Sequence, residues 1–143
     1  MSTIFVDSGA FYALADEDDA WHEVSEAFYK KAYQENLFLA SNYVFVESWT
    51  LIHHKLGRTA ARRFWETIRE GVVAVEEITQ ADLAKAWHIF NEYSDHDLSL
   101  VDCTSFALME RLGIDRVFAF DKHFSFYRTA RRKSFACLPG PVF

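Results

Sequence analysis

Five short apolar runs divide the chain, and each is rich in residues that favour strands. They cover residues 3–7, 37–40, 72–76, 116–120 and 134–138. None of them shows the strict alternation of apolar and polar residues that marks a strand with one face in water. Runs of this kind are typical of parallel strands covered on both faces. The pattern therefore predicts a buried parallel sheet of about five strands.

Helical stretches lie between these runs. Residues 20–34 and 59–69 are amphipathic, and the second begins just after Gly57, a glycine suited to ending a helix. Further helices should begin at polar capping residues, namely Ser41 or Asn42, Thr79 and Ser99, and Gly113 should end the last of them. Strands that alternate with helices imply right-handed crossovers. We therefore expect an α/β domain with helices on both faces of the sheet.

The composition fits one folded domain over residues 1–143. Half of the residues are hydrophobic and 17% are aromatic, which excludes a disordered chain. The two cysteines, Cys103 and Cys137, are too few for a disulfide framework and lack the spacing of a zinc site. We find neither the basic start of a signal peptide nor an apolar run long enough for a membrane span. The sequence thus predicts a cytoplasmic protein that does not bind membranes.

The charge is distributed unevenly. A net charge of −6 argues mildly against a nucleic-acid ligand, because phosphate backbones favour basic proteins. Two basic clusters stand out nevertheless: Arg58, Arg62, Arg63 and Arg69, and then Arg128, Arg131, Arg132 and Lys133. Each is either a solvated face or a track for phosphate. Acids that bind a metal ion also lower the net charge without repelling a substrate once the ion is bound, so composition leaves the ligand open.

Four acidic residues stand in apolar surroundings, where a folded chain is expected to exclude charge. Asp7 and Asp121 close the first and fourth predicted strands. Glu47 lies inside the apolar segment 43–49, and Asp102 follows shortly after a predicted helix start. An ionised carboxylate in such surroundings is costly unless a partner compensates it. Four acids with the same problem suggest one shared cation.

The predicted topology brings these acids together. In doubly wound sheets, ligands bind beyond the carboxyl ends of the strands, where the strand order reverses. Asp7 and Asp121 project from that edge, the first turn of the helix with Asp102 faces it, and Glu47 lies one turn into its helix. Carboxylate oxygens suit Mg²⁺ or Mn²⁺, which polarise phosphates and activate water. The sequence therefore predicts a metal-dependent enzyme that cleaves phosphodiesters.

Each acid also has a purely structural interpretation. Asp7 could cap the helix that follows it, and Asp121 could form an ion pair within its loop beside Lys122 and His123. Asp102 would gain from the dipole of its helix without any metal. Glu47 has the weakest structural alternative, because its neighbours on both sides are apolar.

Other residues and enzyme classes carry less weight. Asp97 is a further candidate in a loop, and the histidines, His123 among them, have no metal-binding spacing and are interpreted as surface or core residues. Ser8 lacks the G-x-S-x-G context of a hydrolase nucleophile. A phospho-acceptor domain would have paired acids after the first strand. A haloacid-dehalogenase-like phosphatase would need Asp at position 9, which is glycine.

The acidic motifs resemble those of PIN-domain ribonucleases. Residues 6–14 resemble the opening of that family, and the segments 41–48, 98–103 and 120–124 resemble its other three acidic motifs. They occur in the family's order over nearly the whole chain. The resemblance implies a three-layer α/β/α domain and Mg²⁺- or Mn²⁺-dependent endoribonuclease activity. Asp7 and Asp102 would be direct metal ligands, while Glu47 and Asp121 would complete the shell and orient the attacking water.

The resemblance also implies partners. Small single-domain members are commonly toxins of VapBC-type toxin–antitoxin pairs, which form homodimers and are held inactive by a cognate antitoxin protein. The alternatives are a PIN nuclease of RNA processing without an antitoxin, and a non-catalytic interaction module. Loss of an acid would mark the module, and none is missing. Contacts to the RNA substrate are expected from aromatic and basic side chains near the C-terminus: Tyr127, Arg128, Arg131 and Arg132.

Overall fold

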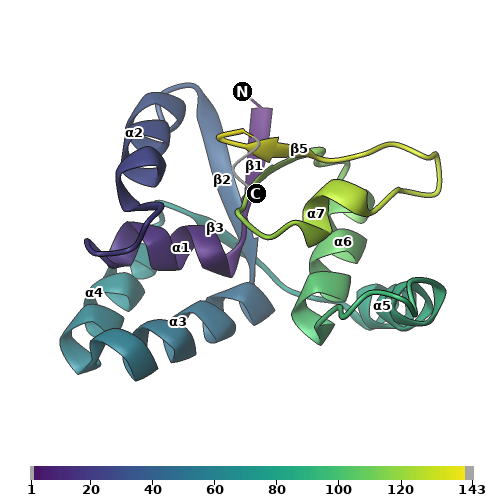
Figure 1. The fold of residues 1–143 in the computed structure, drawn as a ribbon, viewed down its shortest axis with the longest axis horizontal. Coiled ribbons are helices and arrows are strands. Elements are labelled where there is room, and N and C mark those ends of the chain that lie inside the picture. The colour runs from purple at the N-terminus through teal and green to yellow at the C-terminus, as the bar shows by residue number, and fades with distance from the viewer. Residues whose placement is uncertain (1, 141–143) are drawn as a thin grey trace.

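The computed structural model describes residues 2–140, which form a five-stranded sheet between layers of helices (Figure 1). The strands are β1 (Ser2–Val6), β2 (Asn36–Ser41), β3 (Ala74–Glu76), β4 (Arg116–Phe118) and β5 (Ala136–Leu138). Their order is β3-β2-β1-β4-β5, and every neighbouring pair is parallel. The predicted parallel α/β/α architecture is therefore confirmed.

Seven helices connect and cover these strands within the described residues. They are α1 (Ser8–Ala15), α2 (His22–Ala32), α3 (Asn42–Leu56), α4 (Arg58–Arg69), α5 (Gln80–Glu92), α6 (Leu100–Leu112) and α7 (His123–Phe126). Figure 1 shows α1 and α2 on one side of the sheet and α5 and α6 on the other. Between residues 2 and 140, no helix has the length and apolar character that a membrane crossing requires.

Helices α5 and α6 begin with the same local structure. The Thr79 hydroxyl accepts the Asp82 backbone N–H, and the Asp82 carboxylate accepts the Thr79 backbone N–H. Ser99 and Asp102 repeat this reciprocal capping box at the start of α6. Such pairs satisfy backbone donors that have no partner within the helix. The two predicted helix starts are confirmed.

Two glycines end helices at the predicted places. Gly57 separates α3 from α4 with φ of 93°, and Gly113 ends α6 with φ of 70°. Residues with a Cβ rarely adopt positive φ angles, so glycine is the residue that allows the two helices to end at these positions.

The aromatic core includes one residue that the sequence placed at the surface. Tyr127 is 3% exposed and stacks between Phe106 and Phe135, with its hydroxyl donating to Glu110 at 2.8 Å. The expectation that Tyr127 contacts RNA is therefore wrong. In the sequence, a single aromatic residue beside basic residues suggests a surface position. In the structure, the ring of Tyr127 fills the space between α6 and the last strand.

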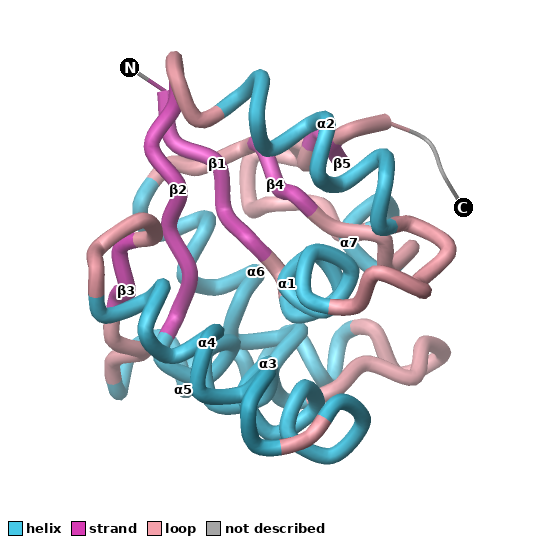
Figure 2. Tube along the Cα trace, turned by 90° about the vertical axis from the view of Figure 1, so that its left-hand side faces the viewer, coloured by secondary structure: helices cyan, strands magenta, loops and turns pink. Residues whose placement is uncertain are grey.

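The strand order reverses between β1 and β4. From β1 the chain moves outward through β2 and β3, then returns to build β4 and β5 on the other side, as Figure 2 shows. Asp7 directly follows β1, as predicted. The fourth strand ends earlier than predicted, at Phe118, although the Ala119 backbone N–H still donates to the Leu138 carbonyl of β5 at 3.2 Å. Asp121 therefore lies three residues past β4, still at the carboxyl edge.

Candidate active site

Asp7 is a buried carboxylate without a structural task. It stands at the N-cap position of α1, yet its side chain makes no capping hydrogen bond, so the capping alternative is not realised. Only 4% of the residue is exposed. Burial, and next the negative charge of Asp102, raise the pKa of Asp7 to about 8 against the lowering effect of the Ser8 backbone N–H; the charges of Glu47 and Asp121 add to the rise. Carboxylates with so little compensation are typical of functional sites, and a cation would stabilise this one.

Asp102 serves both its helix and the cluster. Its Oδ2 accepts the Ser99 backbone N–H at 3.2 Å, so the structural alternative is realised in part. Burial raises the pKa of Asp102, and the charge of Asp121 raises it further. The Ser99 hydrogen bond and the nearby His123 lower this pKa, but they do not cancel the rise. The capping box fixes this carboxylate at the carboxyl edge of the sheet.

Glu47 is half-buried on α3, and Ser8 holds its side chain in place. From the sequence, Ser8 was a candidate only for a nucleophile. The Ser8 hydroxyl donates to Glu47 Oε1 at 2.6 Å, across 39 residues of chain. Burial raises the pKa of Glu47, and the charges of Asp102 and Asp121 raise it further against the lowering effect of Ser8. Ser8 follows Asp7 directly. The segment after β1 therefore supplies the Asp7 carboxylate and also orients Glu47.

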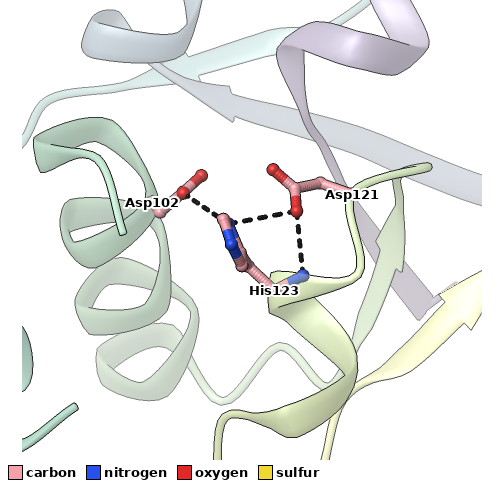
Figure 3. Close-up of side chains that lie close together, drawn as sticks. All are labelled: Asp102, Asp121 and His123. Carbon is pink, nitrogen blue, oxygen red and sulfur yellow. Dashed lines mark hydrogen bonds and ion pairs between the residues drawn. The ribbon is translucent and has the colours of Figure 1, made fainter. Parts of the chain in front are cut away.

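His123 contacts two of the predicted acids, a contact that its isolated position in the sequence did not indicate. Its Nδ1 lies 3.0 Å from Asp102 Oδ2 and 3.1 Å from Asp121 Oδ1, between the two carboxylates (Figure 3). The His123 backbone N–H also donates to Asp121 Oδ1 at 2.9 Å. Ligand atoms of these three residues all lie within 4.8 Å of one another. An aspartate that accepts an N–H two residues later is a common local turn, and that pattern could have linked Asp121 to His123.

Asp102 and Asp121 lie with His123 in one group whose ligand atoms are within 4.8 Å of one another, and Asp7 and Glu47 are close enough for their charges to interact with these two acids. The four acids come from the segments after β1 and β4, the second turn of α3 and the first turn of α6. Among residues 2–140 none of them pairs with a lysine or arginine, and the one basic side chain within ion-pair distance is that of His123. The carboxylate oxygens of these acids are the donors that Mg²⁺ and Mn²⁺ prefer. Which acids bind the ion directly stays a prediction, as does a role for Asp97, which is exposed.

Comparisons with known proteins agree with this geometry. The model of the PIN domain family matches residues 4–132. The 23S rRNA-specific endonuclease VapC20 of Mycobacterium tuberculosis, found in two strains, is 37% identical over 123 residues, which are 85% of this chain and 92% of VapC20.

Two solved structures resemble the fold. The crystal structure of M. tuberculosis VapC20, described as a sarcin–ricin loop cleaving toxin, superposes with a TM-score of 0.77 at 33% identity. The match covers 83% of this chain and 90% of that one. A protein of Pyrobaculum aerophilum, at 21% identity and a TM-score of 0.56, shares the fold over 86% of this chain and 84% of its own. The chain described here belongs to the PIN domain family.

Proposed function

We propose that this protein is a divalent-metal-dependent endoribonuclease and the toxin of a toxin–antitoxin pair. One observation carries the proposal: Asp102 and Asp121 converge with His123, the charges of Asp7 and Glu47 interact with them, and among residues 2–140 no lysine or arginine forms an ion pair with any of the four acids. Membership of the PIN family and the similarity to VapC20 support the same reaction. The non-catalytic alternative leaves the mutual repulsion of these acids without a function.

Mg²⁺ or Mn²⁺ is the cofactor that these donors fit. In our proposal Asp7 and Asp102 bind the ion directly, and Glu47 and Asp121 complete its surroundings. A divalent ion held there supplies Lewis-acid activation of the phosphodiester and of water. The high pKa of Asp7 in the metal-free protein, about 8, implies that binding the ion releases a proton from this cluster.

The chain's own residues would orient the reaction. Ser8 fixes one oxygen of Glu47, which leaves the second oxygen of that carboxylate to accept a proton from the attacking water. His123 holds Asp102 and Asp121 at a fixed separation. The water oxygen would then bond to phosphorus as the bond from phosphorus to the leaving ribose oxygen breaks, and that oxygen would take up a proton from solvent. Positioning of this kind is the main contribution that a protein makes to phosphoryl transfer.

The substrate and partners follow from the relatives. We propose a loop of 23S rRNA as the substrate class, because VapC20 is specific for 23S rRNA and cleaves the sarcin–ricin loop. A cognate antitoxin protein would hold the enzyme inactive. A homodimer is supported by large apolar side chains exposed on α5 and α6: Trp87, Phe90 and Leu100 are 67%, 51% and 62% exposed.

An RNA cleavage assay tests this function. The protein is incubated with a stem–loop RNA of the sarcin–ricin loop sequence, with Mg²⁺, with Mn²⁺ and with chelator. We expect cleavage with either metal, none with chelator, and none by Asp121→Asn. The matched control is Asp115→Asn, an exposed aspartate at the opposite edge, just before β4, which should cleave normally. A wild-type protein that cleaves no RNA with either metal would leave the interaction module as the better account.

A further inference from the structure

A strip of aromatic rings extends outward from the active-site imidazole. The ring centroid of Phe126, the last residue of α7, lies 5.5 Å from that of His123, and the His96 ring stacks on Phe126 at 3.8 Å with 21° between the planes. Tyr93 contacts both Phe126 and His96, at 5.9 Å and 6.2 Å. We call His123, Phe126, His96 and Tyr93 the aromatic strip. Its inner end touches Asp102 and Asp121, and its outer end reaches the loop before α6.

We propose that the outer end of the aromatic strip, at His96 and Phe126, stacks a nucleobase of the RNA next to the cleaved bond. This inference rests on the proposed function and names a base-binding subsite of the same active site. His96 is the accessible member, with 37% of its side chain exposed, while Phe126 is partly exposed behind it. Two ring contacts separate His96 from the cluster of acids.

The chemistry of the strip fits a nucleobase better than a phosphate. Sequence-specific RNA recognition commonly splays a base out of its stack and places it on an aromatic ring. Phe126 has no charge to offer, and the acids Asp95 and Asp97 flank His96, so phosphate is not attracted to this end. Phe126 covers one face of the His96 ring, and 37% of the His96 side chain stays exposed. A flat, partly exposed ring held on one face is a preformed stacking surface.

A cation for the adjoining phosphate lies beside the strip. Arg128 is exposed, and its Nη1 donates to the carbonyls of Ser125 and Tyr127 at 2.8 Å and 3.0 Å. Its backbone N–H donates to the Tyr93 hydroxyl at 3.1 Å, which ties it to the strip. Stacking surface and guanidinium therefore adjoin one another at the end of α7. Basic side chains interleaved with aromatic rings are the usual means of holding single-stranded RNA.

Removal of the nucleobase from the RNA and removal of the His96 ring from the protein should have coupled effects on RNA affinity. Binding of the labelled stem–loop RNA is measured in an Asp7→Asn background, which prevents cleavage during the measurement. Abasic nucleotides are then placed one at a time along the loop. With His96 intact, one abasic position should weaken binding about tenfold, about 1.4 kcal/mol. In His96→Ala the intact RNA should bind about tenfold more weakly, and that same abasic position should cost nothing further.

A second variant and a control sharpen the result. His96→Trp enlarges the stacking surface and should tighten binding of the intact RNA but not of the abasic RNA. Tyr33→Ala removes a more accessible aromatic ring, 51% exposed, that lies before β2 at the amino end of the sheet, and it should change neither. In the protein that retains Asp7, His96→Ala should raise KM with little change in kcat, since His96 does not touch the acids.

Each outcome decides the matter. Independent effects of His96→Ala and the abasic nucleotide at every position would overturn the base-stacking subsite, and so would an Asp7→Asn protein that binds no RNA. Coupled effects on binding, with no cleavage by the wild-type protein in Mg²⁺ or Mn²⁺, would retain the subsite and reject the proposed nuclease activity. Cleavage by the wild-type protein without coupled effects on binding would retain the nuclease activity and reject the base-stacking subsite.

Discussion

Helices α5 and α6 begin with the same capping box, yet the charged groups around the two capping aspartates differ. Asp82 and Asp102 are both buried, at 3% and 7% exposure, and each accepts the backbone N–H of its N-cap residue. The Arg111 side chain then forks onto Asp82, with Nε and Nη2 at 2.9 Å and 3.0 Å from the two carboxylate oxygens. Asp102 has only the His123 imidazole, at 3.0 Å, and the negative charges of Asp121 and Asp7 act on it as well.

The comparison separates a structural acid from a functional one. Burial opposes ionisation at both sites, but the Arg111 hydrogen bonds leave the pKa of Asp82 lowered, whereas the pKa of Asp102 is raised. The local sequence motif is the same, so the difference lies in what the rest of the chain brings to the carboxylate. A compensated acid stabilises the fold, and a set of uncompensated acids is arranged for a ligand.

The largest effect should separate the two aspartates in catalysis. Asp102→Asn keeps an oxygen for the Ser99 backbone N–H but removes a charge from the cluster. We expect it to lower kcat/KM for RNA about a thousandfold, about 4 kcal/mol in transition-state stabilisation. Asp82→Asn should leave kcat/KM unchanged when both are assayed well below their melting temperatures. Equal losses in the two variants would mean that the capping box, and not the cluster, matters.

The second effect should separate them in stability. Arg111→Met leaves Asp82 buried without its counter-ion, and we expect the free energy of unfolding to fall by about 2 kcal/mol. This is less than for a fully buried pair, because the guanidinium is 34% exposed and partly screened by water. Urea denaturation measures it. The lowered pKa of Asp82 means that its contribution is present near neutral pH and is lost as pH falls below about 4. An unchanged urea midpoint would show that the ion pair contributes nothing.

The third prediction concerns pH in metal-free protein. The pKa of Asp7 is raised from 3.8 to about 8, so between these values the folded state holds a proton that the unfolded state has lost. Stability should therefore decline as pH rises through this window, by at most about 1.4 kcal/mol per pH unit. Asp7→Asn should remove that slope and raise the melting temperature in chelator at pH 8 by roughly 5 °C. A lower melting temperature for the variant would count against a repulsive cluster.

The smallest effect should come from Ser8. Ser8→Ala removes the hydrogen bond to Glu47, which raises the pKa of Glu47 further and frees its side chain. We expect kcat/KM to fall about tenfold, about 1.4 kcal/mol, with the steepest loss at low pH. Ser8→Thr keeps the hydroxyl and should retain most of the activity. If Thr and Ala prove equally poor, the hydroxyl is not what positions Glu47.

Much of the fold and the cluster could be predicted from the sequence, because both rest on regular backbone geometry. Parallel strands end at one edge, and a capping serine fixes where a helix begins. Asp7 and Asp102 could therefore be placed from the pattern alone. His123 could not, because a single histidine has no period and its partner Asp102 lies 21 residues away. Helix α7 was missed for a similar reason, since its four residues make about one turn.

Side-chain contacts between distant segments explain the remaining differences. Ser8 meets Glu47 only after β1 and α3 have packed. Tyr127 looked like a surface residue because three of its near neighbours in sequence are arginines, and only the packing of α6 shows that its ring is buried. Sequence patterns record the geometry of each element, whereas these contacts depend on how the elements meet.

Manganese binding measured by electron paramagnetic resonance tests the central claim most directly, because free Mn²⁺ gives a signal that decreases on binding and no RNA is needed. The wild-type protein and Asp82→Asn should bind the ion with equal affinity. Asp102→Asn should bind it at least roughly tenfold more weakly, the loss of one charged ligand. Equal affinity in wild type and Asp102→Asn, or no binding by either, would contradict an acid cluster built for a cation.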